Sequence, residues 1–421
     1  MSPRSAGFLA FLNLLAGPLV RAETAPADAA ALMRAAVQSA QAGDFTAAVA
    51  GMEAAVAQRP GHPAYLYNLA CMQALAGQSV AAINTLGQLA AWGLSAPAAQ
   101  DGDFASLADN GRFQAVASRL TKNRAARGHA GVAFTLPAQT GVIEGIARRE
   151  STGEVFFGDM RARTIWRRNA AGAVTAFTAP NDRLAGLGGL AIDEARGLLW
   201  AAASAQEIMA GDAPAEPNGL AAFDLTTGEL RHWYPVPADD APHATVDLTL
   251  GPDGALYLSD SAAPVIWRLA PDGAALAEWF RDPNLRSLQG LAWSADGAVL
   301  YVADYTLGLF AIDPTTRTAK AVPARNNTLV CIDGLVRDGD RLIAVQNGVT
   351  PARVLAIAPD PAGGAAAVTE LVAGLPAMRD ATLGCVTGEG YWFIAHAGWD
   401  KFGRGGDPTA PHECPVLHVK F

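Results

Sequence analysis

The sequence predicts a mainly β fold of six repeated sheets, preceded by a small α-helical domain. The repeated unit is clearest at residues 289–304, QGLAWSADGAVLYVAD, where two apolar strands flank an Asp-Gly turn. Alternating apolar residues on both sides of such a turn are a strong β-hairpin signal. The unit recurs with periods mostly in the forties, and its strand-opening pairs are Glu144-Gly145, Gly188-Gly189, Val246-Asp247, Gln289-Gly290, Asp333-Gly334 and, more loosely, Leu383-Gly384.

A second apolar strand follows every opening strand, and a third follows most of them. The second strands are EVFFGD (154–159), LLWAAAS (198–204), ALYLSD (255–260), VLYVAD (299–304), RLIAVQN (341–347) and YWFIAH (391–396). A sheet of this kind can bury its faces only against neighbouring sheets, so six of them predict a six-bladed β-propeller over residues 132–421. The tryptophans expected in the core between blades are Trp166, Trp200, Trp267 and Trp293.

The two ends of the predicted propeller complement each other. VAFTLP (132–137) precedes the first unit and has no partner of its own. The last unit, with PVLHVKF (415–421) as its third strand, is one strand short of four. We expect residues 132–137 to supply the outer strand of the last blade, because this pairing closes the ring and removes an open sheet edge.

Residues 1–22 have the pattern of a secretory signal peptide. Arg4 precedes an apolar run from about Ala6 to Val20, and Val20-Arg21-Ala22 is a small-x-small cleavage site. A frayed apolar helix is the alternative, and it would leave this segment unburied. No later stretch is long and apolar enough to cross a bilayer. The sequence therefore predicts an exported protein, periplasmic or secreted, with no membrane span.

The composition of the 421 residues narrows the partners. The formal net charge of −9 argues against nucleic acid, because phosphate binding needs a basic face. The four cysteines match no zinc motif, and in an exported chain they allow disulfides without specifying them. Cys71 is expected to be a small core residue. Cys385 and Cys414 are the expected pair, because both fall in the last blade.

Residues 28–125 are rich in alanine and follow a helical pattern. Gly43 and Gly77 lie 34 residues apart, each between two predicted helices, and this arrangement resembles a pair of tetratricopeptide repeats. Residues 103–120 resemble the shortened last unit of such arrays. The resemblance implies a packing or docking module with a protein partner. Residues 126–131, within the basic stretch KNRAARGHAG, are expected to be a linker.

The first residue of each β unit is expected at the mouth of the central channel, where the innermost strands begin. These residues are Glu144, Gly188, Val246, Gln289, Asp333 and Leu383. Two converging carboxylates repel each other unless something neutralises them, and a divalent cation would do so. All the donors are oxygens, which favours Ca²⁺, Mg²⁺ or Mn²⁺. The alternative, that Glu144 and Asp333 are solvated or backbone-bonded turn residues, stays open.

Four stretches of the β units are the most distinctive: IEGIARRESTGEVFFGDMRARTIWR (143–167), VDLTLGPDGALYLSDS (246–261), residues 289–304 and IDGLVRDGDRLIAV (332–345). They resemble the regucalcin/gluconolactonase family of six-bladed propellers. The resemblance implies one metal ion at the channel mouth, held by a Glu, two Asn and an Asp. It also implies hydrolysis of lactones and related esters, with the Asp acting as the base.

The residues that match this pattern are carried over one by one. Glu144 and Asp333 match the family's acids, Gln289 stands where one Asn is expected, and Val246 stands where the other is. The resemblance therefore implies Glu144, Gln289 and Asp333 as metal ligands, with Asp333 also the catalytic base. Asp247 follows Val246, and strand alternation predicts that its side chain points elsewhere.

Other polar residues are interpreted as structural. Aspartates that end second strands at corresponding places predict a shared turn or inter-strand hydrogen bond: Asp159, Asp260 and Asp304. Long insertions at residues 205–219 and 397–414 are candidate lids over the face that carries Glu144 and Asp333. Three further residues could contact a substrate, but we expect them to be satisfied surface or loop residues: His243, His396 and Trp399.

Three functions are compatible with these observations. The first, which the pair Glu144 and Asp333 favours, is an exported metal-dependent hydrolase of lactones or related esters that acts on a small-molecule substrate. The second is a propeller that binds a small ligand without turnover, or that runs metal-free chemistry as strictosidine-synthase-like proteins do, and Val246 favours it. The third is an interaction scaffold in which the helical repeats dock a protein. The first is the function that we predict.

Overall fold

The computed structural model describes residues 28–139, 141–179, 181–403 and 405–421. The predicted signal peptide lies outside these residues. The chain divides into two compact units. The first is helical and runs to Ala125, with the short stretches Asn326–Thr328 and Val349–Pro351; the second begins at Ala126 and contains the β-sheets.

The first unit consists of two helical hairpins and a terminal helix. Its elements are α1 (Ala29–Gln41), α2 (Phe45–Gln58), α3 (Pro63–Leu75), α4 (Ser79–Ala91), the 3₁₀ helix η2 (Gly102–Leu107) and α5 (Gly111–Lys122). Gly43 and Gly77 follow α1 and α3 with φ values of 83° and 74°, a left-handed conformation that glycine adopts without strain. The predicted helical domain is confirmed, and its assignment to tetratricopeptide repeats stays a prediction. None of the described helices is long and apolar enough to cross a membrane.

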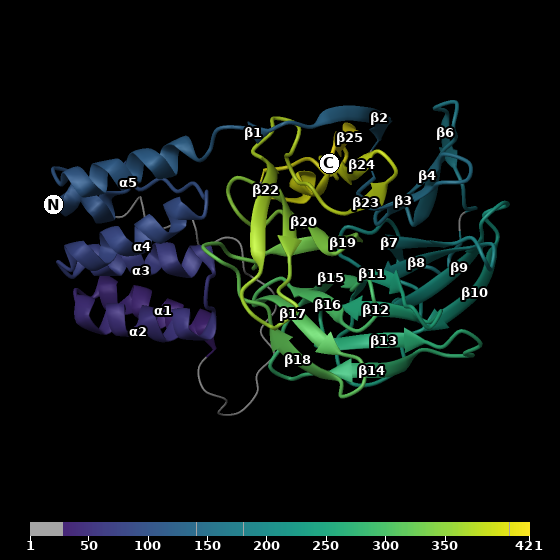
Figure 1. Cartoon of the computed structure of the whole chain (residues 1–421), viewed down its shortest axis with the longest axis horizontal. Coiled ribbons are helices and arrows are strands. Elements are labelled where there is room, and N and C mark those ends of the chain that lie inside the picture. The colour runs from purple at the N-terminus through teal and green to yellow at the C-terminus, as the bar shows by residue number, and fades with distance from the viewer. Residues whose placement is uncertain (1–27, 140, 180, 404) are drawn as a thin grey trace. The chain divides into compact units, whose positions relative to one another are not determined.

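The second unit contains six antiparallel sheets that follow one another along the chain (Figure 1). The first blade consists of β3 (Ile143–Arg149), β4 (Glu154–Asp159), β5 (Thr164–Arg168) and β6 (Val174–Ala176). The second consists of β7 (Gly186–Asp193), β8 (Leu198–Ser204), β9 (Gly219–Asp224) and β10 (Leu230–Pro235). The third consists of β11 (Thr245–Leu250), β12 (Leu256–Asp260), β13 (Val265–Leu269) and β14 (Ala277–Arg281).

The remaining blades repeat this order. The fourth consists of β15 (Leu288–Trp293), β16 (Leu300–Asp304), β17 (Gly308–Asp313) and β18 (Thr318–Ala321). The fifth consists of β19 (Ile332–Asp338), β20 (Arg341–Gln346), β21 (Arg353–Ala358) and β22 (Ala367–Ala373). The last consists of β23 (Gly384–Thr387), β24 (Gly390–Ile394), β25 (His412–Val419) and β2 (Gly131–Gln139). The prediction of a six-bladed β-propeller is therefore confirmed.

The innermost strands form a closed ring. Strand β3 contacts β7, and the contacts continue through β11, β15, β19 and β23 back to β3, around the middle of the propeller (Figure 1). Strand β2 pairs with β25, with Val132 opposite Leu417 and Phe134 opposite Val416. The predicted closure of the last blade by residues 132–137 is therefore confirmed. The ring places the first residues of all six inner strands around one axis.

Apolar side chains fill the spaces between adjacent blades. One cluster between the second and third blades contains Trp200 and Trp267, and another between the third and fourth contains Tyr257 and Trp293. These three tryptophans are 4%, 3% and 7% exposed, as predicted for core residues, whereas Trp166 is half-buried. Burying a large apolar side chain contributes about 1.5–3 kcal/mol.

The predicted linker contains a short strand. Strand β1 (Arg127–Gly128) pairs with β22 and extends the fifth blade. Arg127 donates from Nε and Nη2 to the two carboxylate oxygens of Glu370, at 2.7 and 2.9 Å. Part of the predicted linker is therefore a β-strand that pairs with the edge strand β22.

The predicted pairing of Cys385 with Cys414 is wrong, because all four cysteines are free thiols. Cys385 lies opposite Trp392 on β24, and Trp392 lies opposite His418 on β25. Cys414 is at the other end of β25, where it pairs with Leu136. Strand β24 therefore lies between the strands of the two cysteines, and the two cysteines lie toward opposite ends of the blade. Cys71 is buried among the helices, as expected for a core residue.

Candidate functional site

A β-bulge opens each of the first five inner strands. The pairing register shifts between Ile143 and Gly145 in the first blade, and the same shift occurs at the opening pairs of the next four blades. A Cβ atom on Gly145 would lie 2.1 Å from the carbonyl oxygen of Gly188, and one on Gly290 would lie 2.4 Å from the nitrogen of Leu335. Glycine at the second position therefore lets adjacent inner strands approach closely around the channel.

The bulges bring Glu144 and Asp333 into electrostatic contact across the channel mouth. Burial raises the pKa of Glu144 well above its usual value, and the negative charge of Asp333 raises it further. Burial also raises the pKa of Asp333 to about 6. Both side chains nevertheless keep partial solvent exposure, a combination expected for groups that line a narrow channel. Two acids that are far apart in the sequence thus share one site.

Each of these carboxylates receives one fixed hydrogen bond. The indole N–H of Trp399 donates to Glu144 Oε1. Asn347 Nδ2 donates to Asp333 Oδ2 at 2.7 Å and to the carbonyl of Ala381 at 2.9 Å. The hydroxyl of Tyr305 donates to Asn347 Oδ1 at 3.0 Å, so every polar atom of the Asn347 amide has a defined role. Among the described residues, the hydrogen bonds therefore reach one oxygen of each carboxylate.

The other predicted ligand, Gln289, lies on the blade next to Asp333. A Cβ atom on its neighbour Gly290 would lie 2.8 Å from the carbonyl oxygen of Asp333. Gln289 Nε2 donates to Ser287 Oγ at 3.2 Å, which leaves the amide oxygen to accept or coordinate. Val246 brings no oxygen donor to the ring. The sequence-predicted ligands thus come from three blades and present oxygen atoms, the donors that Ca²⁺, Mg²⁺ and Mn²⁺ prefer.

Asp247 lies closer to the site than strand alternation predicts. The bulge between Thr245 and Leu248 breaks the alternation of β11. The charges of Asp247 and Glu144 interact, as do those of Asp247 and Asp333. Burial raises the pKa of Asp247 to about 7. The signal that could have identified it is its place in the repeat, because the other five blades carry glycine there.

In the described part of the chain, these three acids are not paired with cationic side chains. None of the ion pairs among the described residues includes Glu144, Asp247 or Asp333. Buried carboxylates without a cationic partner must bind protons or a cation. Their oxygen donors are of the type that a hard divalent ion prefers, but the carboxylate oxygens of these three described acids do not all lie within 4.8 Å of one another.

The two predicted lid loops meet beside Glu144. Trp399 begins a 3₁₀ turn, η3 (Trp399–Phe402), in the loop of the last blade. Trp399 and Phe402 pack against an apolar cluster that includes Ile208 from the loop of the second blade. Arg161 donates to the carbonyl of Ile208 at 2.9 Å. Trp399, expected to be an ordinary loop residue, instead touches a predicted ligand, and the sequence contains no signal for this contact.

The repeated aspartates have the structural role that the sequence predicts. Asp260 Oδ1 accepts from the backbone N–H groups of Ala244, Ala262 and Ala263 at 2.9–3.1 Å. Asp159 and Asp304 bind equivalent backbone N–H groups in their own blades. His243 lies 2.6 Å from Asp260 Oδ2 through Nδ1. These acids hold the turns that follow the second strands.

Two further clusters contain metal-ligating residue types. His396 Nε2 lies 3.3 Å from Asp400 and 3.9 Å from Asp380. Asp380 accepts the backbone N–H groups of Ala397 and Gly398, both at 2.8 Å, and Asp400 pairs with Arg379 at 2.6 Å. This network holds the start of the lid loop in place.

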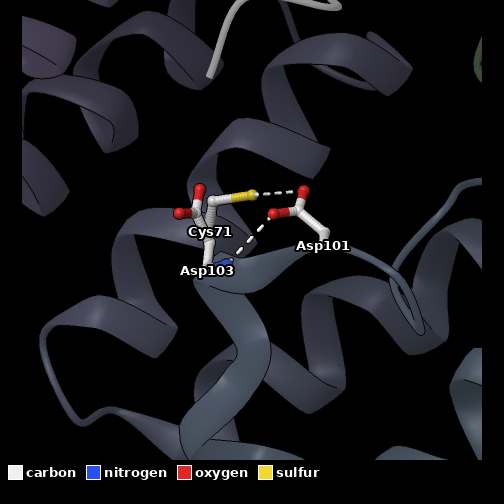
Figure 2. A group of neighbouring side chains, drawn as sticks. All are labelled: Cys71, Asp101 and Asp103. Atoms are coloured by element: carbon white, nitrogen blue, oxygen red, sulfur yellow. Dashed lines mark hydrogen bonds between the residues drawn. The ribbon is translucent and has the colours of Figure 1, made fainter. Parts of the chain in front are cut away.

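The second cluster lies in the helical unit, where Cys71, Asp101 and Asp103 surround one another (Figure 2). Asp101 accepts from the hydroxyl of Tyr67 at 2.7 Å and from the backbone N–H of Asp103 at 3.1 Å. The thiol of Cys71 donates to the same carboxylate at 4.0 Å. Burial raises the pKa of this thiol, which disfavours the thiolate that a metal would need. The cluster caps η2 and joins it to α3.

Comparison with known proteins finds similar solved structures of low sequence identity. No family model and no curated protein matches the chain. Similar solved structures include a PQQ-bound aldose sugar dehydrogenase from Streptomyces coelicolor (18% identity, TM-score 0.49, 70% of this chain and 99% of that chain). A gluconolactonase from Xanthomonas campestris (18%, 0.47, 69% and 98%) and the calcium-binding protein regucalcin from Agrobacterium tumefaciens (18%, 0.47, 69% and 96%) are also similar. At identities of 18%, the function of this chain must be argued from its own residues.

Proposed function

We propose that the protein is an exported hydrolase of lactones or related esters that uses a divalent cation at the channel mouth. The observation that supports this function is the electrostatic interaction between Glu144 and Asp333, from the first and fifth blades, with no ion pair to either acid among the described residues. Gln289 completes a set of oxygen donors. A bound divalent cation would supply Lewis acidity to a substrate carbonyl and lower the pKa of water.

The residues of the chain divide the remaining tasks. Asp333, whose Oδ2 is held by Asn347, keeps Oδ1 available to take a proton from the attacking water. A base must be ionised to act, and a pKa of about 6 leaves Asp333 mostly ionised at neutral pH. Glu144 is fixed by Trp399 through Oε1, which leaves Oε2 as its free donor. A fixed position of both acids lowers the cost of orienting them during the reaction.

The two loops limit access of solvent to this site. Trp399 places aromatic surface beside Glu144, and it packs in one apolar cluster with Phe402 and with Ile208 from the other loop. A less hydrated site strengthens electrostatic interactions and suits a substrate with an apolar ring or ester group. We therefore assign substrate selection to residues 205–219 and to the described residues of 397–414.

Metal content and hydrolysis test the proposal together. We expect purified wild-type protein to contain about one equivalent of Ca²⁺, Mg²⁺ or Mn²⁺ by elemental analysis, and to hydrolyse members of a panel of lactones and aryl esters. Asp333→Ala should lose both the ion and the activity. Asp182→Ala, at an exposed aspartate, is the matched control and should retain both. A wild type that remains metal-free after incubation with each ion, and is inactive on the whole panel, contradicts the proposal.

A second candidate function is binding of a small ligand without turnover. Val246 supports it, because one position of the ring lacks a donor side chain. Ligand binding that Asp333→Asn abolishes, in a wild type without hydrolysis, would establish this function instead. For the helical unit we propose docking of a protein partner, and for the chain an exported, periplasmic or secreted location. Fractionation of cells that express the full chain tests the location.

A further inference from the structure

The central channel contains a cavity of about 450 Å³ at the end where the inner strands finish. Turns after β11 and β15, residues 250–252 and 294–297, form part of its border. Its volume lies in the usual range for small-molecule sites, about 300–1,000 Å³. The residues of its aliphatic wall are Ile146, Leu190, Leu248, Leu291, Leu335 and Leu383. This cavity therefore differs in composition from the acidic ring at the start of the same strands.

One carboxyl group lies in this aliphatic surrounding. Asp247 lines the cavity, and its Oδ1 accepts from the backbone N–H of Leu248 at 2.9 Å. It occupies the position at which the other five blades carry glycine. A Cβ atom on Gly189 would lie 2.3 Å from Asp247 Oδ1, so the glycine of the neighbouring blade makes room for this carboxyl. The third blade thus departs from the repeat, and Gly189 of the second blade leaves space for the carboxyl group of Asp247.

The charges around Asp247 favour a positive ligand. Glu144 and Asp333 act on it from the channel mouth, and no ion pair of the described residues includes it. The border of the cavity carries Asp296 and Arg337, one residue of each sign. Asp296 is occupied by Ser294 Oγ at 2.6 Å and by the N–H of Ala298 at 3.0 Å. Asp247, the acid inside the cavity, therefore decides the sign of the potential there.

We propose that this cavity binds a small organic cation, an ammonium group on a compact aliphatic body. Asp247 would accept a hydrogen bond from the ammonium group and balance its charge. The aliphatic wall would cover the hydrocarbon part of the ligand, whose transfer from water is favourable. A charge-assisted hydrogen bond in a surrounding of low dielectric constant is stronger than one at the surface. The proposal does not depend on the hydrolase function.

Matched probes test the cavity directly. We expect cyclohexylammonium chloride to bind the wild type at one site in calorimetry, with a Kd on the order of 1 mM. Cyclohexanol has the same body without the charge and should bind at least tenfold more weakly. Sodium chloride at equal ionic strength is the reference. Equal affinity for the amine and the alcohol would overturn the proposal without any variant.

Two variants assign the site. Asp247→Asn keeps the shape of the side chain and should weaken cyclohexylammonium at least tenfold, with little change for cyclohexanol. Asp182→Asn removes the same charge from an exposed position and should leave both affinities unchanged. Retained amine binding in Asp247→Asn, or equal loss in both variants, would show surface binding and refute the assignment. A thermal unfolding scan of each variant verifies that it is folded.

Discussion

The propeller carries two sets of acids, one at the ends of its second strands and the other at the starts of its first strands. Asp260 belongs to the first set, and backbone N–H groups surround one of its oxygens. Glu144 and Asp333 belong to the second set, and each receives a hydrogen bond at one oxygen. An acid that recurs from blade to blade with saturated oxygens serves the fold. An acid that occurs in few blades, with free oxygens and no counter-charge, is available to a ligand.

The largest expected difference between the two sets concerns activity. Glu144→Gln should lower the rate of lactone hydrolysis about 10²–10³-fold, the usual cost of removing one electrostatic group from a site. In metal-free samples its thermal midpoint should equal or exceed that of the wild type, because the change removes a buried acid whose charge repels Asp333. Initial rates and calorimetric scans measure the two effects. Glu413→Gln, at an exposed position, is the control, and a large loss of stability in Glu144→Gln would contradict the comparison.

The opposite behaviour is expected of the repeated acids. Asp260→Ala leaves three backbone N–H groups without their acceptor and should cost about 3 kcal/mol of unfolding free energy. The folded fraction should retain its rate of hydrolysis. Denaturation in urea, followed by tryptophan fluorescence, gives the first quantity. Asp272→Ala, at an exposed turn, should leave the unfolding free energy unchanged. An Asp260→Ala variant that is stable but inactive would contradict the comparison, because it would assign Asp260 to the acids that bind a ligand.

Asp247 should resemble the second set in its pH dependence. Its pKa is about 7 in the folded protein and about 4 in an unfolded chain, so the folded state binds the proton more tightly. Its contribution to stability is therefore fully present below pH 4 and is lost as the pH rises through 7. The pKa difference corresponds to at most about 4 kcal/mol, and the partial exposure of Asp247 reduces it. Asp247→Asn lacks this loss and should be more stable than the wild type by about 1–2 kcal/mol at pH 8, and by little at pH 4.

Chemical denaturation of both proteins at several pH values measures this difference. The gain should increase between pH 4 and pH 7 and then remain constant. A gain that is independent of pH would mean that Asp247 is not destabilised by burial of its charge.

The smallest expected effect concerns the contact between the lid loop and Glu144. Trp399→Phe keeps an aromatic ring but removes the N–H donor, and should lower kcat/KM roughly tenfold, or about 1.5 kcal/mol. Trp392→Phe is a matched control, because the Trp392 N–H has no hydrogen-bond partner among the described groups. Steady-state kinetics on one lactone compares the two. Equal rates in both variants would show that the hydrogen bond from Trp399 to Glu144 does not contribute to catalysis.

The sequence predicts the inner part of each blade better than the outer part. The second strands are almost continuously apolar, because both of their faces are buried between blades. The outer strands β6 and β18 are three and four residues long and mostly exposed, so they carry no apolar pattern. Asp247 was missed for a different reason. A bulge changes the direction of a side chain, and a prediction that assumes strict alternation along the strand cannot anticipate this change.

The candidate site also combines features that the sequence predicts with features that it does not predict. Position in the repeat was sufficient to bring Glu144 and Asp333 together, because the ring geometry fixes where each inner strand begins. The contact of Trp399 with Glu144 depends on the path of a long loop, which no local pattern specifies. The predicted disulfide is wrong because two cysteines in the same blade need not lie close together when a third strand separates their strands.

The pairing of β2 with β25 has a practical consequence for anyone who wishes to produce the propeller alone. The segment that follows the helical unit is also the last blade's outermost strand, so a shortened gene must start before Gly131. A gene that starts at the first complete hairpin would leave β25 with a bare edge, ready to recruit the missing strand from another molecule. Such a product should form oligomers, and adding residues 131–139 as a separate peptide should return it to single molecules.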